Sequence, residues 1–235
     1  MKNASLVFAL VILMLAAAES RGQTPVVINT PGEEAKSPEL TRADKSLIER
    51  SALPKVRKKL ADGACEESFE PAGVVEGSFS KPAATQRLVF YQFCQTGNGL
   101  GWAGLILIEN NRVVGNYVAD AGWVVAFKPL PDINQNGLNE LALYYSGGMH
   151  QGYGGTGVDV VEFGAGGPKG LGWFQAETFS DAGPVIGYKV TAVPGPTPVF
   201  YREKHVQNAA GRWRKSGTKT PIKLKAIIKA FEPVR

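Results

Sequence analysis

The chain has 235 residues, of which 44% are hydrophobic and 20% charged, and its formal net charge is +5. If residues 1–20, which are considered below, are set aside, roughly 210 residues remain. That length is enough for one domain with its own hydrophobic core. No later stretch is long and apolar enough to cross a membrane, and no basic and aromatic motif indicates a nucleic-acid partner.

Residues 1–20 have the layout of a secretory signal peptide. Lys2 precedes an apolar run from Leu6 to Ala18, and Ala16 and Ala18 form an Ala-x-Ala cleavage site. The run of about 13 residues is shorter than the roughly 20 that a membrane-spanning helix needs. We therefore expect a periplasmic or secreted protein that is not transmembrane after cleavage, with an N-terminal membrane anchor as the alternative.

Export to an oxidising compartment favours a disulfide between the two cysteines of the chain, Cys65 and Cys94. Closing this loop of about 30 residues would stabilise the fold by roughly 3–4 kcal/mol in the chain-entropy model. A zinc site is not supported, because the two cysteines and the distant His150 and His205 show no ligand spacing.

Charge is divided unevenly along the chain. Residues 61–201 have 6 basic and 13 acidic side chains, whereas residues 202–235 have 10 basic and 2 acidic ones. We expect the basic C-terminal region to be a solvated face or to contact an anionic surface of lipid or glycan.

Residues 21–40 are rich in Pro, Gly and charge, and they predict a flexible leader. Residues 41–62 predict a short helical segment. Thr41 can cap a helix with Ile48 on its apolar face, and Pro54 can stand in the first turn of a second helix. This segment is expected to pack against a sheet, or else to serve as an interaction helix.

Residues 63–235 predict one β-rich domain, because short apolar or alternating runs are separated every few residues by Gly, Pro and Asn. Glu109–Arg112 is expected to be a hairpin turn. The expected fold class is mainly β, with blade-like antiparallel sheets in an incomplete propeller-like array or a β-sandwich. Strands are expected at residues 73–79, 87–94, 104–108, 113–118, 124–127, 140–145, 158–163, 173–179, 188–193, 199–202 and 213–215.

The nine residues DINQNGLNE combine the features of a calcium-binding loop. Calcium takes six to eight oxygen ligands, and alternate side chains of a tightly curled loop can converge on one ion. Gly137, at the sixth position, permits the sharp turn that such a loop needs. Oxygen-bearing side chains recur at the first, third, fifth and ninth positions, which are Asp132, Asn134, Asn136 and Glu140.

This loop resembles the D-x-[DN]-x-[DN]-G-x-x-[DE] loop of FG-GAP/VCBS-type repeats in integrin-like β-propellers, which leads directly into a strand. An EF-hand is excluded, because Leu143 stands where that motif needs a bidentate acid. The resemblance covers under a tenth of the chain. It implies that the four polar residues are side-chain calcium ligands and that Leu138 supplies a carbonyl. The alternative is a metal-free polar turn, in which Asp and Asn side chains cap the backbone.

The glycine-rich stretch at residues 146–157 lacks the Lys-Ser/Thr pair of a phosphate loop. We expect a long flexible hairpin loop or, alternatively, a ligand-binding rim that uses His150 and Tyr153.

No catalytic motif is recognisable in the sequence. The leading hypothesis is an exported structural or binding module with a calcium-binding loop and no evident catalysis, whose partner is an unidentified protein or glycan. The alternatives are a calcium-independent secreted binding or inhibitor-like protein and an exported hydrolase.

Overall fold

A computed structural model describes most of the chain, and of residues 121–125 and 146–150 it describes only the backbone. The predicted signal peptide and Cys65 lie outside the described residues. The described residues are 24–33, 38–61, 68–97, 100–150, 152–164, 166–227 and 231–234.

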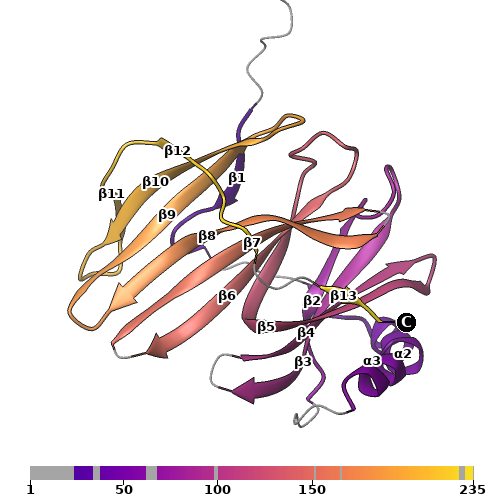
Figure 1. The fold of residues 1–235 in the computed structure, drawn as a ribbon. Helices are drawn as coiled ribbons and strands as arrows, with labels where there is room; N and C mark the ends of the chain where they lie inside the picture. Colours follow the sequence, from indigo (N-terminus) through magenta and orange to yellow (C-terminus); the bar gives the residue numbers. More distant parts are fainter. Residues whose placement is uncertain are drawn as a thin grey trace, which may run out of the picture.

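Most of the described chain is β-strand, which confirms the mainly β fold class, and two short helices lie near its N-terminal end (Figure 1). Each expected strand from residue 73 onward lies wholly or largely within an observed one. In chain order the elements are β1 Val26–Asn29, α2 Arg42–Ser51, α3 Leu53–Lys59, β2 Glu70–Gly77, β3 Gln86–Gly97, β4 Leu100–Glu109, β5 Arg112–Leu130, β6 Glu140–His150, β7 Tyr153–Gly164, β8 Gly167–Ser180, β9 Gly183–Val193, β10 Val199–Gln207, β11 Trp213–Lys215, β12 Thr220–Ile222 and β13 Glu232–Pro233.

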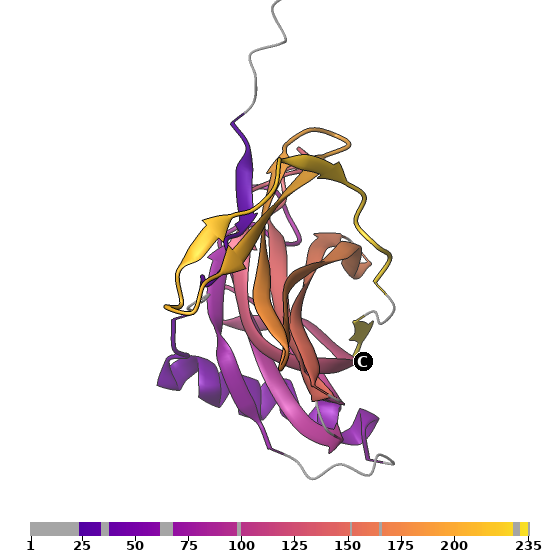
Figure 2. The same cartoon turned by 90° about the vertical axis from the view of Figure 1, so that its left-hand side faces the viewer.

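The strands form one antiparallel meander, in which β2 to β11 pair with their neighbours in chain order. Asn110 and Asn111 form the β4–β5 turn with φ values of 50° and 57°, as a tight hairpin requires, so the expected turn is confirmed. From the sequence, we expected the strands to form either an incomplete propeller-like array of blades or a β-sandwich. The structure joins them in one continuous sheet that curls strongly along its length (Figures 1 and 2).

The curl is centred on β5, which is 19 residues long. Its first part, 112–122, pairs with β4, and its second part, 123–130, pairs with β6. An irregularity between Val124 and Ala126 interrupts the second ladder, and such bulges bend a strand and increase its twist. β5 therefore belongs to both halves of the sheet and turns one half toward the other.

An inner core fills the space between the two halves. Phe90 of β3 contacts Phe127 of β5, with ring centroids 5.6 Å apart, and Phe79 contacts Phe163 of β7 at 6.1 Å. All four rings are buried. Aromatic pairs at these distances add roughly 0.5–1.5 kcal/mol each beyond the area they bury.

The opposite face of the first half-sheet packs against the helices. Strand side chains alternate between faces, so Val89 and Tyr91 lie on the helical side while Phe90 faces the inner core. As expected, Thr41 caps α2 by accepting a hydrogen bond from the Asp44 backbone N–H at 3.1 Å. The predicted helical segment therefore packs against the sheet.

One expectation is corrected at the N-terminal end, where Val26–Asn29 belongs to the predicted flexible leader but forms strand β1, paired with β9. Ile28 is fully buried, and its carbonyl accepts a hydrogen bond from the Tyr144 hydroxyl at 2.9 Å. The apolar face of the second half-sheet needs a cover, and this short Val-Val-Ile run supplies it despite its Pro- and Gly-rich surroundings.

The C-terminal segment, residues 223–227 and 231–234, lies along the open side of the curl (Figure 2). Lys225 pairs with Trp173 of β8, and β13 pairs with the first half of β5. Gly172 permits the close packing of this segment, because a Cβ at that residue would lie 2.5 Å from Leu224 Cβ. Among the described residues, no helix has the length and apolar character needed to cross a membrane.

We predict that Ile28→Ala lowers the free energy of unfolding by roughly 2–4 kcal/mol, because the change leaves a cavity beneath β1. Val27→Ala is the matched control, since Val27 is 44% exposed on the same strand and should cost less than about 1 kcal/mol. Urea unfolding of both variants measures the difference. Equal, small losses would mean that β1 contributes little to the fold.

Candidate functional site

The predicted calcium loop joins the end of β5 to the start of β6. It begins after Leu130, and Glu140 is the first residue of β6, so the loop leads directly into a strand as expected. Ile133 is fully buried and anchors the loop, and its carbonyl accepts a hydrogen bond from the Gly195 N–H at 3.0 Å.

Asp132 organises the turn by accepting two backbone hydrogen bonds. Its Oδ1 accepts from the Asn136 N–H at 3.0 Å, and its Oδ2 accepts from the Gly137 N–H at 2.7 Å. Gly137 has a φ of 86°, which glycine adopts without strain. The carboxylate at the first position therefore lies on the inside of the curled loop.

The two asparagines link the loop to β7. Asn134 Nδ2 and Asn136 Nδ2 both donate to Glu162 Oε2, at 2.6 Å and 3.2 Å. The Oδ1 atoms accept backbone hydrogen bonds within the loop, Asn134 from Asn136 and Asn136 from Leu138. Glu162 was not singled out in the sequence, although the β6–β7 register, which pairs Leu141 with Val161, places it beside the loop.

Glu140 is the most unusual group of the loop. The residue is 0% exposed, and its Oε2 accepts a hydrogen bond from the Ile133 N–H at 2.8 Å. Its Oε1 is buried and has no hydrogen-bond partner. Burial raises the pKa of this carboxyl to about 7, the Ile133 N–H opposes the rise, and the negative charges of Asp132 and Glu162 add to it.

Asn139, which the sequence pattern did not mark, fixes the loop to the end of β2. Its Oδ1 accepts from the Ser78 N–H at 2.7 Å, and its own N–H donates to the Ser78 carbonyl at 2.8 Å. Its Nδ2 donates to the Leu130 carbonyl at 3.0 Å. An asparagine beside a turn is too common in sequences to signal this role.

These contacts test whether the loop fits a calcium ion. Among the described residues, no group of three or more His, Cys, Asp or Glu side chains is placed to hold a metal. Calcium also accepts amide and backbone oxygens, and each oxygen of the loop that takes one N–H keeps a further lone pair. Glu140 Oε1, the Asp132 carboxylate and the two asparagine carbonyl groups are oxygens of the kind that calcium takes as ligands.

The other predicted site residues are not brought to this loop by any contact among the described residues. Tyr153 is 71% exposed at the start of β7, and the His150 side chain lies outside the described residues. The glycine-rich stretch contributes to strands β6 and β7 on either side of a short turn, so its predicted hairpin has a shorter loop than expected. Cys94 is disulfide-bonded, but its pairing with Cys65 stays a prediction, because Cys65 is not described.

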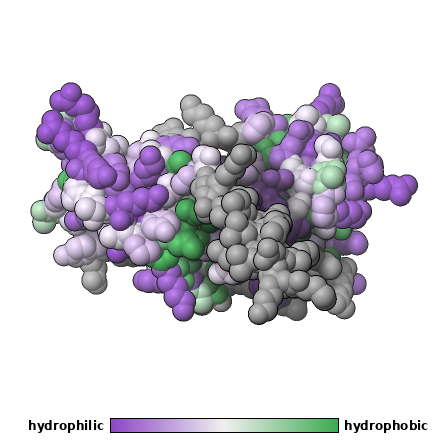
Figure 3. All heavy atoms as spheres, turned by 90° about the horizontal axis from the view of Figure 1, so that it is seen from above, coloured by the Kyte–Doolittle hydropathy of each residue, from purple (hydrophilic) through white to green (hydrophobic). Residues whose placement is uncertain are grey.

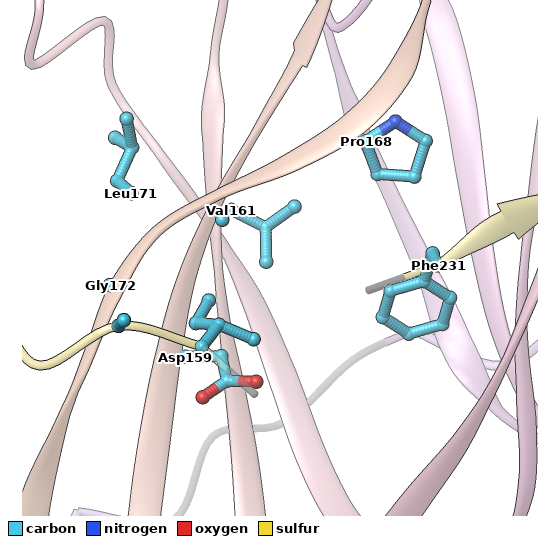
Figure 4. A pocket seen from close by; sticks show the side chains of 9 residues that line it. Asp159, Val161, Pro168, Leu171, Gly172 and Phe231 are labelled. Atoms are coloured by element: carbon cyan, nitrogen blue, oxygen red, sulfur yellow. The ribbon is translucent and has the colours of Figure 1, made fainter. Parts of the chain in front are cut away.

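A separate cavity of about 290 Å³ lies between β7, β8 and the C-terminal segment. Asp159 is the charged residue of its lining, which also includes the apolar residues Val161, Leu171 and Phe231 (Figure 4). Burial raises the pKa of Asp159 to about 6, and a hydrogen bond with the Tyr145 hydroxyl opposes that rise. Asp159 and Tyr145 therefore form a polar pair inside the curl, which the sequence did not indicate.

Comparison with known proteins gives no match for the chain among protein-family models, curated proteins or solved structures.

We predict that Asp159→Asn removes a pH-dependent destabilisation. The Asp159 pKa is higher in the folded protein than its usual value of about 3.9, so the folded state binds the proton more tightly, and this contribution to stability is lost as pH rises through about 6. The unfolding free energy of the variant minus that of the wild type should therefore rise between pH 4 and pH 7, by on the order of 2 kcal/mol at most.

Urea unfolding at a series of pH values measures this difference. Asp181→Asn is the control, because Asp181 is exposed in the β8–β9 turn, so this variant makes the same chemical change outside the cavity. A constant difference for Asp159→Asn would contradict the prediction.

Proposed function

We propose that the chain is an exported β-rich structural or binding module in which the Asp132–Glu140 loop binds calcium as a structural ion. The observation that supports this most is Glu140 Oε1, a carboxylate oxygen that is fully buried without a hydrogen-bond partner. Leaving such an atom unsatisfied costs about 1–3 kcal/mol, and more when it is charged. A cation at the loop would offset that cost.

The ligands in this proposal are the side-chain oxygens of Asp132, Asn134, Asn136 and Glu140 and the carbonyl of Leu138. Calcium would supply the positive charge that neutralises the two ligand carboxylates. Two carboxylates among neutral oxygens suit a weak extracellular site, with a dissociation constant on the order of 10⁻⁴–10⁻³ M.

The chain's own residues define what the ion would stabilise. Asn139 joins the loop to Ser78, and the Ile133 carbonyl joins it to Gly195. Ser78 follows β2 in the first half of the sheet, and Gly195 follows β9 in the second. An ion that makes the loop rigid would therefore strengthen a connection between the two half-sheets, which is a structural role.

A periplasmic or extracellular location belongs to the same proposal and rests on the signal-peptide layout of residues 1–20. If the chain binds a protein or a glycan, the candidate binding surface is the β6–β7 turn. Tyr153 projects there with 71% of its surface exposed. Loops and turns on a rigid sheet commonly present binding groups.

We predict that calcium raises the melting temperature of the wild type relative to EGTA. A ligand that binds only the native state adds about 2.7 kcal/mol at 100 times its dissociation constant. For a domain of this size this corresponds to a rise of roughly 5–10 °C. Asp132→Asn and Glu140→Gln should each remove most of the rise, because each replaces a ligand carboxylate with a neutral amide of nearly the same shape.

Glu49→Gln is the matched control, since Glu49 is exposed on α2 and its loss of charge should leave the calcium effect intact. Isothermal titration calorimetry with calcium chloride provides a second readout that is independent of folding. No heat and no melting shift at 10 mM calcium would contradict the proposal. The loop would then be a metal-free polar turn, and the module a calcium-independent binding protein.

A further inference from the structure

Strands β8 and β9 are hydrogen-bonded only near their shared turn. The ladder joins 177–180 of β8 to 183–187 of β9 and then stops. Beyond it, Trp173 of β8 pairs with Lys225, and Val190 of β9 pairs with Asn29 of β1. The two strands therefore diverge, and a second cavity of about 290 Å³ lies beside them, which we name the fork cavity.

Three basic residues from two segments line the fork cavity: Arg202 of β10, and Lys223 and Lys225 after β12. Two of them are held by aromatic rings. The Arg202 guanidinium carbon is 5.0 Å from the centre of the Tyr188 ring, and Lys225 Nζ is 4.8 Å from the centre of the Trp173 ring. Such cation–π contacts orient a charged group without neutralising it.

The backbone also fixes Lys225 in place. Its N–H donates to the Trp173 carbonyl at 2.9 Å, and its carbonyl accepts from the Trp173 N–H at 2.8 Å. The position of this lysine at the cavity is therefore set by the fold.

Among the described residues, no carboxylate lines the fork cavity, and its three cations form no ion pair. The two acids of residues 202–235 contact other basic residues. Glu203 contacts His205, at 2.9 Å, and Lys215, and Glu232 contacts Lys59 at 3.0 Å. The acids of this region therefore do not neutralise the three basic residues at the cavity.

The surroundings of the cavity differ in hydropathy across the molecule. The end of the molecule with β10 and β11, at the left in Figures 1 and 3, presents a mostly hydrophilic surface, while hydrophobic side chains surface nearer the middle. The cavity's inner wall is apolar, with Phe174 and Val190 buried and Ile222 half-buried.

We propose that the fork cavity binds a phosphate or sulfate monoester, with the oxyanion held by Arg202, Lys223 and Lys225 and the organic part against the apolar wall. Guanidinium and ammonium groups form strong charge-assisted hydrogen bonds with such oxyanions. The cavity is larger than a bare phosphate ion, and its apolar wall favours a ligand with a small carbon body, such as a sugar ring. This site shares no residue with the calcium loop and does not depend on calcium.

The test is isothermal titration calorimetry on the full chain in calcium-free buffer at low ionic strength. The probes are glucose 6-phosphate, glucose, inorganic phosphate, and vesicles of phosphatidylcholine with and without phosphatidic acid, whose headgroup is a phosphate monoester. Glucose 6-phosphate should bind more tightly than inorganic phosphate, and glucose should not bind. Added salt should weaken the binding, because screening reduces attraction between exposed charges.

The cavity variant Arg202→Gln/Lys223→Gln/Lys225→Gln should bind glucose 6-phosphate at least tenfold more weakly. The matched control Lys45→Gln/Lys55→Gln/Lys58→Gln removes the same charge from exposed helical positions and should stay within twofold of the wild type. Melting temperatures of both triple variants check folding. The single change Lys223→Gln, at an exposed residue, should weaken binding at least threefold and keeps the test valid if the triple variant does not fold.

The vesicles distinguish two sources of the same chemistry. Binding to anionic vesicles that glucose 6-phosphate displaces would identify a lipid headgroup as the ligand, whereas glucose 6-phosphate binding alone would identify a soluble ester. The proposal is overturned if glucose 6-phosphate does not bind, or if the control variant loses as much affinity as the cavity variant.

Discussion

The structure depends on the hydrogen-bond ladder of one long strand. β5 pairs with β4 along its first part and with β6 along its second, so both halves of the sheet are joined through it. Buried backbone N–H and C=O groups must be hydrogen-bonded, so both parts of β5 stay paired with their neighbours through the bend. The bend in β5 therefore sets how the two halves of the sheet face each other. The inner core lies between the two halves, the proposed calcium loop follows the end of β5, and β13 pairs with the first part of β5.

A curled sheet of this kind has apolar side chains on both faces, and each outer face needs a cover. The helices α2 and α3 cover the outer face of the first half, and β1 together with residues near β12 covers part of the second. The covers come from the two ends of the chain, while the meander comes from its middle. Residues that look like linkers by composition, such as Val26–Asn29, are therefore structural parts of the domain.

Local features of this fold could be predicted from the sequence, whereas contacts between distant residues could not. Alternating apolar residues gave the strands, and Thr41 and Pro54 placed the starts of the helices. The curled loop with Gly137 at a positive φ was also expected, because its turn is formed by neighbours in the chain. Glu162, Asn139 and the cations of the fork cavity were not found, because their roles arise from strand register and from pairing across many residues.

The meander also explains why oppositely charged sites can exist on one small domain. When each strand pairs with its neighbour in the chain, separation along the sequence becomes separation across the sheet. The acidic side chains gathered around Glu140 lie on β6, β7 and the loop before them, whereas the basic residues of the fork cavity lie beside β8, β10 and β12. A fold with long crossovers could bring the acidic middle of this sequence against its basic end, and the charges would neutralise one another. Here no ion pair among the described residues joins Arg202, Lys223 and Lys225 to the acidic side chains near Glu140, although the C-terminal segment returns across β8.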